Sequence, residues 1–369
     1  MSRLKKIGMA FGYGLLLVAI VVVMCYAHIG ACDHRESQRI SGFVIHIDGN
    51  GNHMLIDTES MYKWFAKHGV SPKGKSIAEL DLGALERVAL EHSAVESCNA
   101  FVTYDGRIEM TIIQREPIAR LRLDGGYDHY IANDGVLFRA SDGYAAYVPV
   151  ITGSHRLIVD RDFSGNVFRY IADSIAALER RIVEIEHKKY PVLSDRKQIK
   201  KRDKSVQDST VKKPFWISKE TYEARKENLK LFKEAHNQKY LKEDAVLVKQ
   251  LDKLSNMQER LRHNITSLES INADFERLVE FIKSALADSF WSAEITQLVL
   301  TSGDKGAIHI AIVPRSGDYT IDLGDTHNLT QKLQNTRDFY DKVLRNVGWD
   351  KYSRISVRYD GQVVCLPRN

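Results

Sequence analysis

The sequence predicts a mixed α+β protein that is held to a membrane by one helix, and three observations support this. An uninterrupted apolar run occupies residues 7–27. Short runs with strand-like alternation are interleaved with helical patterns up to residue 185 and again after residue 275. Between these regions, apolar residues recur every seven positions, as they do in coiled coils. The predicted architecture is therefore an anchor, two mixed regions and an inserted helical segment.

The apolar run has the length of a transmembrane helix and contains no charge and no proline. A helix over residues 7–27 would be about 30 Å long, which is the thickness of a hydrocarbon core. The predicted anchor includes Leu15, Leu16, Leu17, Ile20, Val21, Val22 and Val23. The only charges in residues 1–6 are basic, so this short tail is expected in the cytoplasm. The remainder of the chain is then periplasmic and attached to the inner membrane by a single pass.

Two other interpretations of the apolar run are weaker. A cleaved signal peptide has an apolar region of only about 7–15 residues. Residues 29–32, with the sequence IGAC, loosely resemble a lipoprotein processing site. The apolar run is too long for that signal as well, and charged residues follow at once. An uncleaved anchor is therefore the preferred prediction.

Charge and cysteine content exclude some classes of function. The net charge of +5 is local, because residues 186–216 hold ten Lys or Arg against four Asp or Glu. No nucleic-acid-binding surface is indicated for the chain as a whole. The four cysteines show no CxxC or Cys/His spacing, so no metal site is predicted. Cys98 and Cys365 allow one disulfide in an oxidising periplasm, although two separate buried cysteines are the preferred interpretation.

Residues 42–114 predict the order β-α-α-β-β, with the helices on one face of a small sheet. A first strand covers residues 43–47. Asp57 is expected to cap a helix, and Asp81 is expected to start a second one. The turn Asp105-Gly106 then joins two strands over residues 95–104 and 107–114, which is a strong hairpin signal.

Several later segments follow this unit in a recognisable order. They are QREPIAR at 114–120, HYIANDGVLF at 129–138, YVPVITG at 147–153, IVPRSGDY at 312–319, WDKYS at 349–353 and VRYDGQVVC at 357–365. Together with the unit at 42–114, these segments resemble the FtsQ/DivIB family of bacterial cell-division proteins, in the form found in Bacteroidetes. The resemblance covers about residues 28–175 and 275–369.

The resemblance implies a POTRA domain at 42–114, followed by a β-domain made of residues 115–185 and 275–369. Alternating patterns and Asx-Gly turns predict a mostly antiparallel sheet with helices on one side. The family is bitopic and non-enzymatic. Its members work in the divisome at the division septum, where they control septal peptidoglycan synthesis. The implied partners are FtsB- and FtsL-like proteins and other divisome components, with no cofactor and no small-molecule substrate.

Residues 186–274 depart from the family pattern and are interpreted as an insertion. Residues 186–216 are basic and polar and contain Pro191 and Pro214, so a flexible loop is expected there. A heptad stripe follows at Leu247, Leu254, Leu261, Leu268, Phe275 and Ile282, with companions at Leu251, Gln258, Ile265, Asn272, Val279 and Leu286. A helical hairpin that packs on itself is the preferred prediction, and a coiled coil that binds a partner or a second copy is the alternative.

The predicted partner-binding site is the last strand, expected over residues 355–364 at an open edge of the β-domain. A partner strand can add to such an edge through main-chain hydrogen bonds. The candidates are Ser356, Arg358, Tyr359, Gly361, Gln362 and Val364, with Phe339 and Tyr340 of the preceding helix as a lateral pocket. For each residue, the alternative is that it only closes the core of the β-domain.

No catalytic motif is present, because the sequence contains no HExxH, no GxSxG and no glycine-rich loop that leads into a helix. No catalytic residue is therefore predicted. The rival functions are a periplasmic coiled-coil adaptor and an envelope-assembly component that uses the POTRA unit. Both would be expected to have several POTRA units, a β-barrel or a lipoyl-like module, and the sequence shows none of these.

Overall fold

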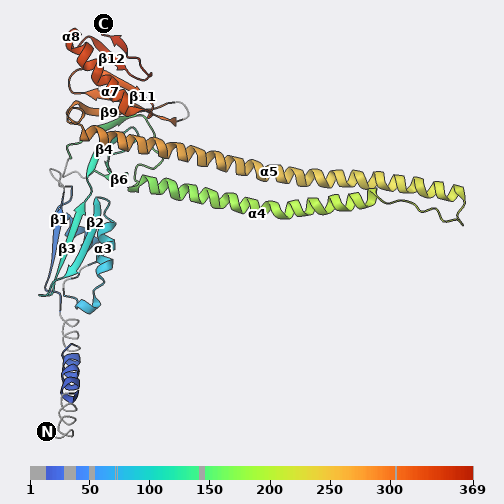
Figure 1. The fold of residues 1–369 in the computed structure, drawn as a ribbon, viewed down its shortest axis with the longest axis horizontal. Coiled ribbons are helices and arrows are strands. Elements are labelled where there is room, and N and C mark those ends of the chain that lie inside the picture. The colour runs from blue at the N-terminus through green and yellow to red at the C-terminus, as the bar shows by residue number, and fades with distance from the viewer. Residues whose placement is uncertain are drawn as a thin grey trace, which may run out of the picture. The chain divides into compact units, whose positions relative to one another are not determined.

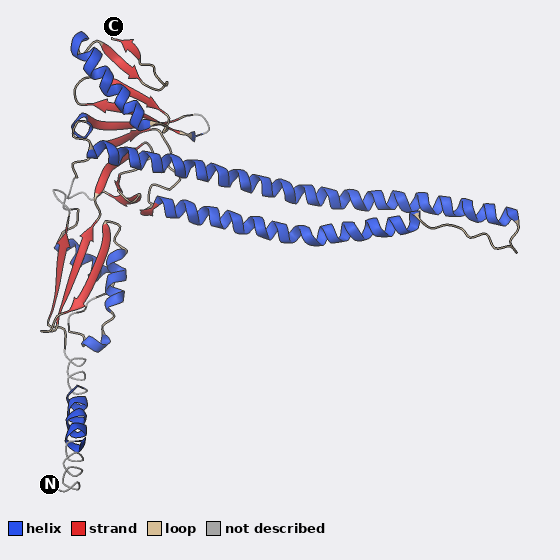
Figure 2. Cartoon of the chain, viewed as in Figure 1, coloured by secondary structure: helices blue, strands red, loops and turns tan. Residues whose placement is uncertain are grey.

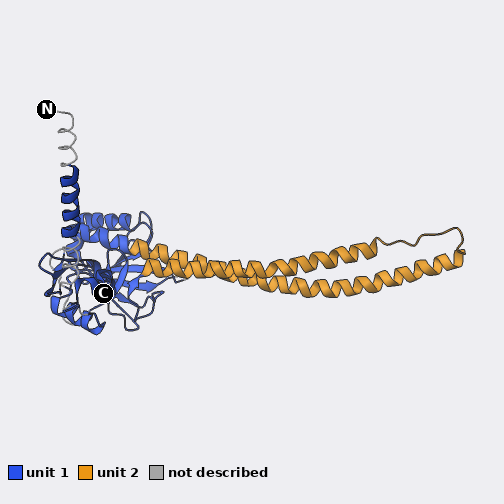
Figure 3. Ribbon diagram, turned by 90° about the horizontal axis from the view of Figure 1, so that it is seen from below, with its two compact units in different colours: residues 1–166, 279–369 blue, residues 167–278 orange. Residues whose placement is uncertain are grey.

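The computed structural model describes residues 14–28, 39–49, 55–70, 72, 74–140, 146–303 and 306–368. The chain is a mixed α+β protein with a large sheet and several helices, as the sequence predicts (Figure 2). It divides into two compact units, which Figure 3 shows in different colours. Unit 1 consists of Met1–Asn166 and Val279–Asn369, and unit 2 consists of Val167–Leu278.

The predicted anchor is described only in part. Residues 14–28 are helical, and their large apolar side chains are exposed, including Leu15, Leu16, Leu17, Ile20, Val21, Val22 and Val23. The tail at 1–6 and the first part of the apolar run, residues 7–13, lie outside the described residues. Among the helices that are described, none combines the length and the apolarity needed to cross a membrane. The single-pass anchor therefore stays a prediction.

The first part of unit 1 has the element order predicted for residues 42–114. Its elements are β1 (Gly42–Asp48), α2 (Thr58–Lys67), the 3-10 turn η1 (Ile77–Glu79), α3 (Leu82–Leu90), β2 (Val95–Val102) and β3 (Arg107–Gln114). The sheet order is β1-β3-β2, with β1 parallel and β2 antiparallel to β3. Asp57 caps α2 by accepting the N–H of Ser60 at 2.5 Å, and Asp81 caps α3 in the same way through the N–H of Ala84.

An apolar core lies between this small sheet and its helices, and it continues to Tyr130 and Phe138 in the second part of unit 1. Met61 and Phe65 of α2 and Leu85 of α3 are almost completely buried. Alternate positions of β3, such as Ile108 and Met110, face the same core. Burying each such side chain stabilises the fold by about 1.5–3 kcal/mol relative to leaving it in water. The helices therefore hold the sheet because one face of each is apolar.

The second part of unit 1 is a ten-stranded sheet with the order β13-β12-β11-β10-β9-β7-β4-β5-β6-β8. The strands are β4 (Pro117–Leu123), β5 (His129–Ala132), β6 (Val136–Arg139), β7 (Val150–Gly153), β8 (Gly165–Asn166), β9 (Ile295–Ser302), β10 (Ile308–Pro314), β11 (Thr320–Gly324), β12 (Tyr352–Ser356) and β13 (Val364–Pro367). Neighbours are antiparallel except in the pairs β4–β7, β7–β9 and β11–β12, so the sheet is mostly antiparallel, as expected.

The two halves of this sheet are far apart in the sequence and meet where β7 pairs with β9. Val150 lies opposite Gln297, whose side-chain amide donates to the hydroxyl of Thr152 at 2.6 Å. Four further helical segments belong to the C-terminal half, namely α6 (Trp291–Glu294), α7 (Leu329–Phe339), the π-helical turn η3 (Tyr340–Leu344) and α8 (Arg345–Val347). The chain therefore leaves this sheet after β8 and returns to it at β9.

Two long helices, α4 (Val167–Gln207) and α5 (Lys219–Ala287), connect β8 to β9 and make up unit 2, except that the last residues of α5 belong to unit 1 (Figure 1). The flexible loop expected over 186–216 is wrong up to Gln207, because α4 continues through Pro191. Proline in a helix interior usually costs about 3 kcal/mol. The helix nevertheless continues, and it still contacts α5 beyond the proline, as in the ion pair of Arg196 with Asp244 at 2.7 Å.

Within unit 2, the apolar seam of α5 packs against α4. Each heptad position named above, from residue 247 to residue 286, is buried or half-buried, and those from Val279 on belong to unit 1. The side-chain amide of Gln258 donates to the carbonyl of Ile182 at 3.2 Å and to Glu186 at 2.8 Å, and its oxygen accepts from Lys189. The rings of Phe168 and Phe275 lie 5.4 Å apart further along the pair. The structure therefore shows a helical hairpin that packs on itself, which was the preferred prediction.

Candidate functional site

The strand β13 forms one end of the ten-stranded sheet and pairs only with β12 among the described strands. In this antiparallel pair, Val364 lies opposite Ser356, and Cys365 lies opposite Ile355. On its other side, β13 has no neighbouring strand in the part of the chain that the structure describes. Such an edge is a template for the addition of a further strand.

The direction of the main-chain groups of β13 follows from the strand geometry. The N–H of Arg368 donates to the carbonyl of Lys351, on the β12 side, at 2.9 Å. Main-chain groups alternate along a strand. The groups of Leu366 therefore point toward β12, whereas those of Cys365 point outward. Because Pro367 has no N–H, the free donor of the edge strand is the N–H of Cys365.

The side chains of β13 make this edge apolar. Val364 and Leu366 lie two residues apart, on one face, and are 51% and 60% exposed. Cys365 is half-buried, and its burial raises the pKa of its thiol. Cys98 is also half-buried and free, and burial raises its thiol pKa to about 11. The structure thus has two separate cysteines instead of a disulfide between them.

The single strand expected over residues 355–364 is wrong. The chain leaves the sheet after Ser356 and turns where the N–H of Gln362 donates to the carbonyl of Tyr359 at 3.2 Å. Gly361 has a φ of 69°, which this turn requires and which suits glycine. The sequence Asp360-Gly361 is a turn signal, so a hairpin of two strands replaces the one long strand.

Ser356 therefore lies one strand in from the edge, which corrects the predicted site. The N–H of Val357 donates to the carbonyl of Asp322 in β11 at 3.0 Å, so the main chain of Ser356 points the other way, into the ladder with β13. Tyr359, Gly361 and Gln362 are exposed in the loop between β12 and β13. None of these three residues closes the core, because all three are exposed. Tyr359, the largest of them, is 55% exposed.

A buried carboxylate supports this end of the sheet. Asp322 is only 5% exposed and accepts a hydrogen bond from Arg354 at 2.7 Å. It also accepts from the hydroxyl of Ser356 at 3.3 Å and from the N–H of Gly324 at 3.0 Å. Arg358 lies 3.4 Å from the same carboxylate. Asp322 therefore ties β11 to β12 and to the start of the loop that carries Tyr359.

Residues 229–366 match the family described as FtsQ/DivIB, C-terminal related. Over these residues the chain is FtsQ/DivIB-like. The matched range covers less than half of the chain. It contains the end strands β11 and β12 and nearly all of β13. It begins inside α5, so it also includes much of the helix that the sequence analysis treated as inserted. No curated protein matches the chain.

The lateral pocket predicted beside the edge of this FtsQ/DivIB-like protein is wrong for Tyr340. Tyr340 is 2% exposed, and its hydroxyl donates to Glu294 at 3.2 Å. Its ring is surrounded by the rings of Phe290, Trp291, Tyr319 and Trp349. Burial raises the pKa of Tyr340, as expected for a core hydroxyl. Phe339 is half-buried, and its ring lies 6.1 Å from that of Tyr352 in β12.

The site that the structure assembles is therefore β13 and the β12–β13 loop. From the predicted set it retains Val364, Tyr359, Gly361 and Gln362, and it adds Cys365 and Leu366. The alternation of Val364 and Leu366 after an Asx-Gly turn was the signal that could have identified them. Within the part of the chain that the structure describes, no group of three His, Cys, Asp or Glu residues could hold a metal ion.

Proposed function

We propose that this protein is a non-enzymatic, bitopic divisome protein that binds FtsB- and FtsL-like partners through β13 and so regulates septal peptidoglycan synthesis. The FtsQ/DivIB-related region indicates a cell-division protein. The observation that carries the binding proposal is the unpaired, apolar outer side of β13.

In the proposed complex, a partner strand adds to the free side of β13. The N–H and C=O of Cys365 would bond to its main chain. The exposed side chains of Val364 and Leu366 would be covered by the partner, and Tyr359 in the adjoining loop would extend the apolar contact. Main-chain bonds give such complexes affinity, and side-chain contacts give them specificity.

The remainder of the chain would place this edge in the periplasm. Residues 7–27 are proposed to anchor the protein in the inner membrane, and the exposed apolar side chains along residues 14–28 support this. Residues 42–114 are proposed to form a POTRA domain, which the order β-α-α-β-β supports. The proposed location is the division septum, with the N-terminus in the cytoplasm.

Depletion followed by complementation tests this function. Cells that lose the protein should form filaments or chains, and the wild-type chain should restore division. The double variant Val364→Lys/Leu366→Lys should not restore it, although it should accumulate to the wild-type level because both side chains are exposed. Envelope leakage with normal division would instead favour the periplasmic adaptor or envelope-assembly function.

A further inference from the structure

The tip of the helical hairpin presents two exposed aromatic rings. Residues 208–218 join α4 to α5 in unit 2. The N–H of Ile217 donates to the carbonyl of Pro214 at 3.3 Å, which closes a turn with Phe215 and Trp216 at its centre. Phe215 is 95% exposed and Trp216 is 73% exposed, and their rings meet edge-on at 4.9 Å. Two large apolar side chains thus stand together at a convex apex.

The loop that carries these rings is basic, and the start of α5 beside it is mixed in charge with a small excess of cations. The exposed cations next to the turn are Lys212, Lys213 and Lys219, and Glu220 and Glu223 are the exposed acidic residues at the start of α5. Asp208 is the single acidic residue in the sequence of 208–218. The ammonium of Lys213 lies 5.5 Å from the centre of the Tyr222 ring, so the middle of this loop contacts α5. An anionic surface would therefore be attracted to the tip.

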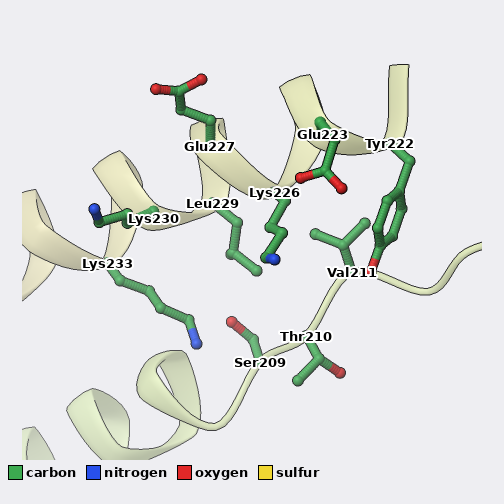
Figure 4. Close-up of a pocket in the computed structure, with 10 residues that line it drawn as sticks. All are labelled: Ser209, Thr210, Val211, Tyr222, Glu223, Lys226, Glu227, Leu229, Lys230 and Lys233. Atoms are coloured by element: carbon green, nitrogen blue, oxygen red, sulfur yellow. The ribbon is translucent and has the colours of Figure 1, made fainter. Parts of the chain in front are cut away.

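A cavity of about 610 Å³ lies behind the loop. It is lined by Ser209, Thr210, Val211, Tyr222, Glu223, Lys226, Glu227, Leu229, Lys230 and Lys233 (Figure 4). In that view Lys226 extends from α5 toward the loop, beside the apolar side chains of Leu229 and Val211, while Glu227 points away from the loop. The cavity therefore combines lysine side chains and apolar side chains with one carboxylate, that of Glu223.

We propose that the tip of the hairpin, residues 208–218, docks on an anionic phospholipid bilayer. Phe215 and Trp216 enter the interfacial layer, where aromatic side chains are favoured. The lysines around them contact lipid phosphates, and the cavity beside Lys226 accepts a headgroup. Basic residues next to a few apolar anchors give reversible, salt-sensitive binding of this kind.

The shape of the tip favours a bilayer over an acidic protein segment. A peptide that used Phe215 and Trp216 as anchors would need to enclose them in a pocket of its own, because they stand at the apex of a turn. A bilayer instead deforms around a convex apolar apex without a preformed pocket. The acidic segment is the alternative that the following experiment distinguishes.

The test uses the fluorescence of Trp216 in the full chain, held in nanodiscs of zwitterionic phospholipid. Vesicles that contain brominated phosphatidylglycerol are added, and bromine quenches only tryptophans that reach the bilayer. The contribution of Trp216 is the difference between the wild type and Trp216→Phe, because the other three tryptophans are common to both chains. We expect strong quenching of this contribution with phosphatidylglycerol at low salt, and little with brominated phosphatidylcholine.

Two lysine pairs provide the variant and its matched control. Lys212→Gln/Lys213→Gln should weaken vesicle binding by about five-fold for each lysine removed. Lys249→Gln/Lys253→Gln removes two exposed lysines about 45 Å further along α5 and should leave vesicle binding unchanged. Phe215→Ser should weaken it by about ten-fold. Circular dichroism at 222 nm should show the same helix content in all variants, since the changed side chains are exposed.

Three results would overturn the proposal. One is the absence of Trp216 quenching by phosphatidylglycerol at low salt. The second is an equal loss of binding for the tip lysine pair and the control pair. The third is a shift of the Trp216 emission with a poly-glutamate peptide while lipid quenching is absent, which would identify an acidic protein segment as the ligand.

Discussion

Replacing Asp322 with alanine should loosen the end of the sheet that carries β13. The carboxylate is 5% exposed and accepts from Arg354 at 2.7 Å, from Ser356 and from the N–H of Gly324. In Asp322→Ala the N–H of Gly324 loses its acceptor inside the protein. Arg354 and Arg358 also lose their counter-charge, and both are partly exposed.

The size of the effect follows from these exposures. Removing one partner of a fully buried ion pair costs about 3–5 kcal/mol. The side chains of Arg354 and Arg358 are 53% and 38% exposed and can be rehydrated, which lowers the cost to about 2–3 kcal/mol. For a domain of this size, each kcal/mol lowers Tm by about 2–4 °C, so the expected fall is about 4–12 °C.

Thermal unfolding followed by near-ultraviolet circular dichroism measures this change, because aromatic side chains surround this end of the sheet. Asp318→Ala is the control, since Asp318 is 97% exposed in its ion pair with Arg368 and should change Tm by less than about 2 °C. A Tm for Asp322→Ala within 2 °C of the wild type, about the shift allowed for the control, would refute the structural role assigned to this carboxylate.

Three further predictions concern other parts of the chain. Removing residues 186–256 and closing the gap with a short Gly/Ser linker should leave the β-domain folded, because α4 and α5 are antiparallel and the sheet closes through β7 and β9; loss of cooperative unfolding would contradict this. Hydrogen bonds from Arg120 lower the pKa of Asp128. The ionised Asp128 carboxylate therefore stabilises the folded protein above about pH 4, and this stabilisation is lost as the pH falls through the lowered pKa. The Tm difference between the wild type and Asp128→Asn should be constant from pH 5 to 8 and should shrink in acid. A Tm difference at about pH 2 as large as that at neutral pH would contradict this role of Asp128. Tyr359→Ala should weaken partner binding at least tenfold with little change in Tm, as expected for an exposed aromatic anchor; equal losses of both would identify a core residue.

The parts of the fold that the sequence predicted well depend on local signals. Asp57 and Asp81 occupy the helix caps where a carboxylate can accept the free N–H groups of a first turn. Asp105-Gly106 forms the turn between β2 and β3, with Gly106 at a φ of 77°. The heptad stripe of α5 is likewise local, and each of its named positions is buried or half-buried.

The failures occurred where distant contacts decide the structure. Pro191 predicts the end of a helix, but contacts of α4 with α5 on both sides of it keep the helix continuous. Tyr340 was predicted to line a lateral partner pocket, yet its hydroxyl donates to Glu294, which lies 46 positions earlier. The division of the last strand into β12 and β13 does not depend on distant contacts. Its turn signal at residues 360–361 is local, so the sequence alone could have predicted it.

The most direct test of the proposed edge site is the affinity of an FtsB-like partner for the full chain carrying Cys365→Pro. This change removes the outward N–H of β13 while the ladder with β12 keeps the main-chain groups of Val364 and Leu366. Cys365→Ser is the matched control, since it removes the thiol but keeps the N–H.

Titration of the purified partner into both variants gives the decisive comparison. Loss of one main-chain hydrogen bond costs about 0.5–1.5 kcal/mol, and the proline ring also obstructs the incoming strand. We therefore predict that Cys365→Pro weakens binding about tenfold with a nearly unchanged Tm, and that Cys365→Ser binds like the wild type. Wild-type affinity in a folded Cys365→Pro variant would contradict partner addition at β13.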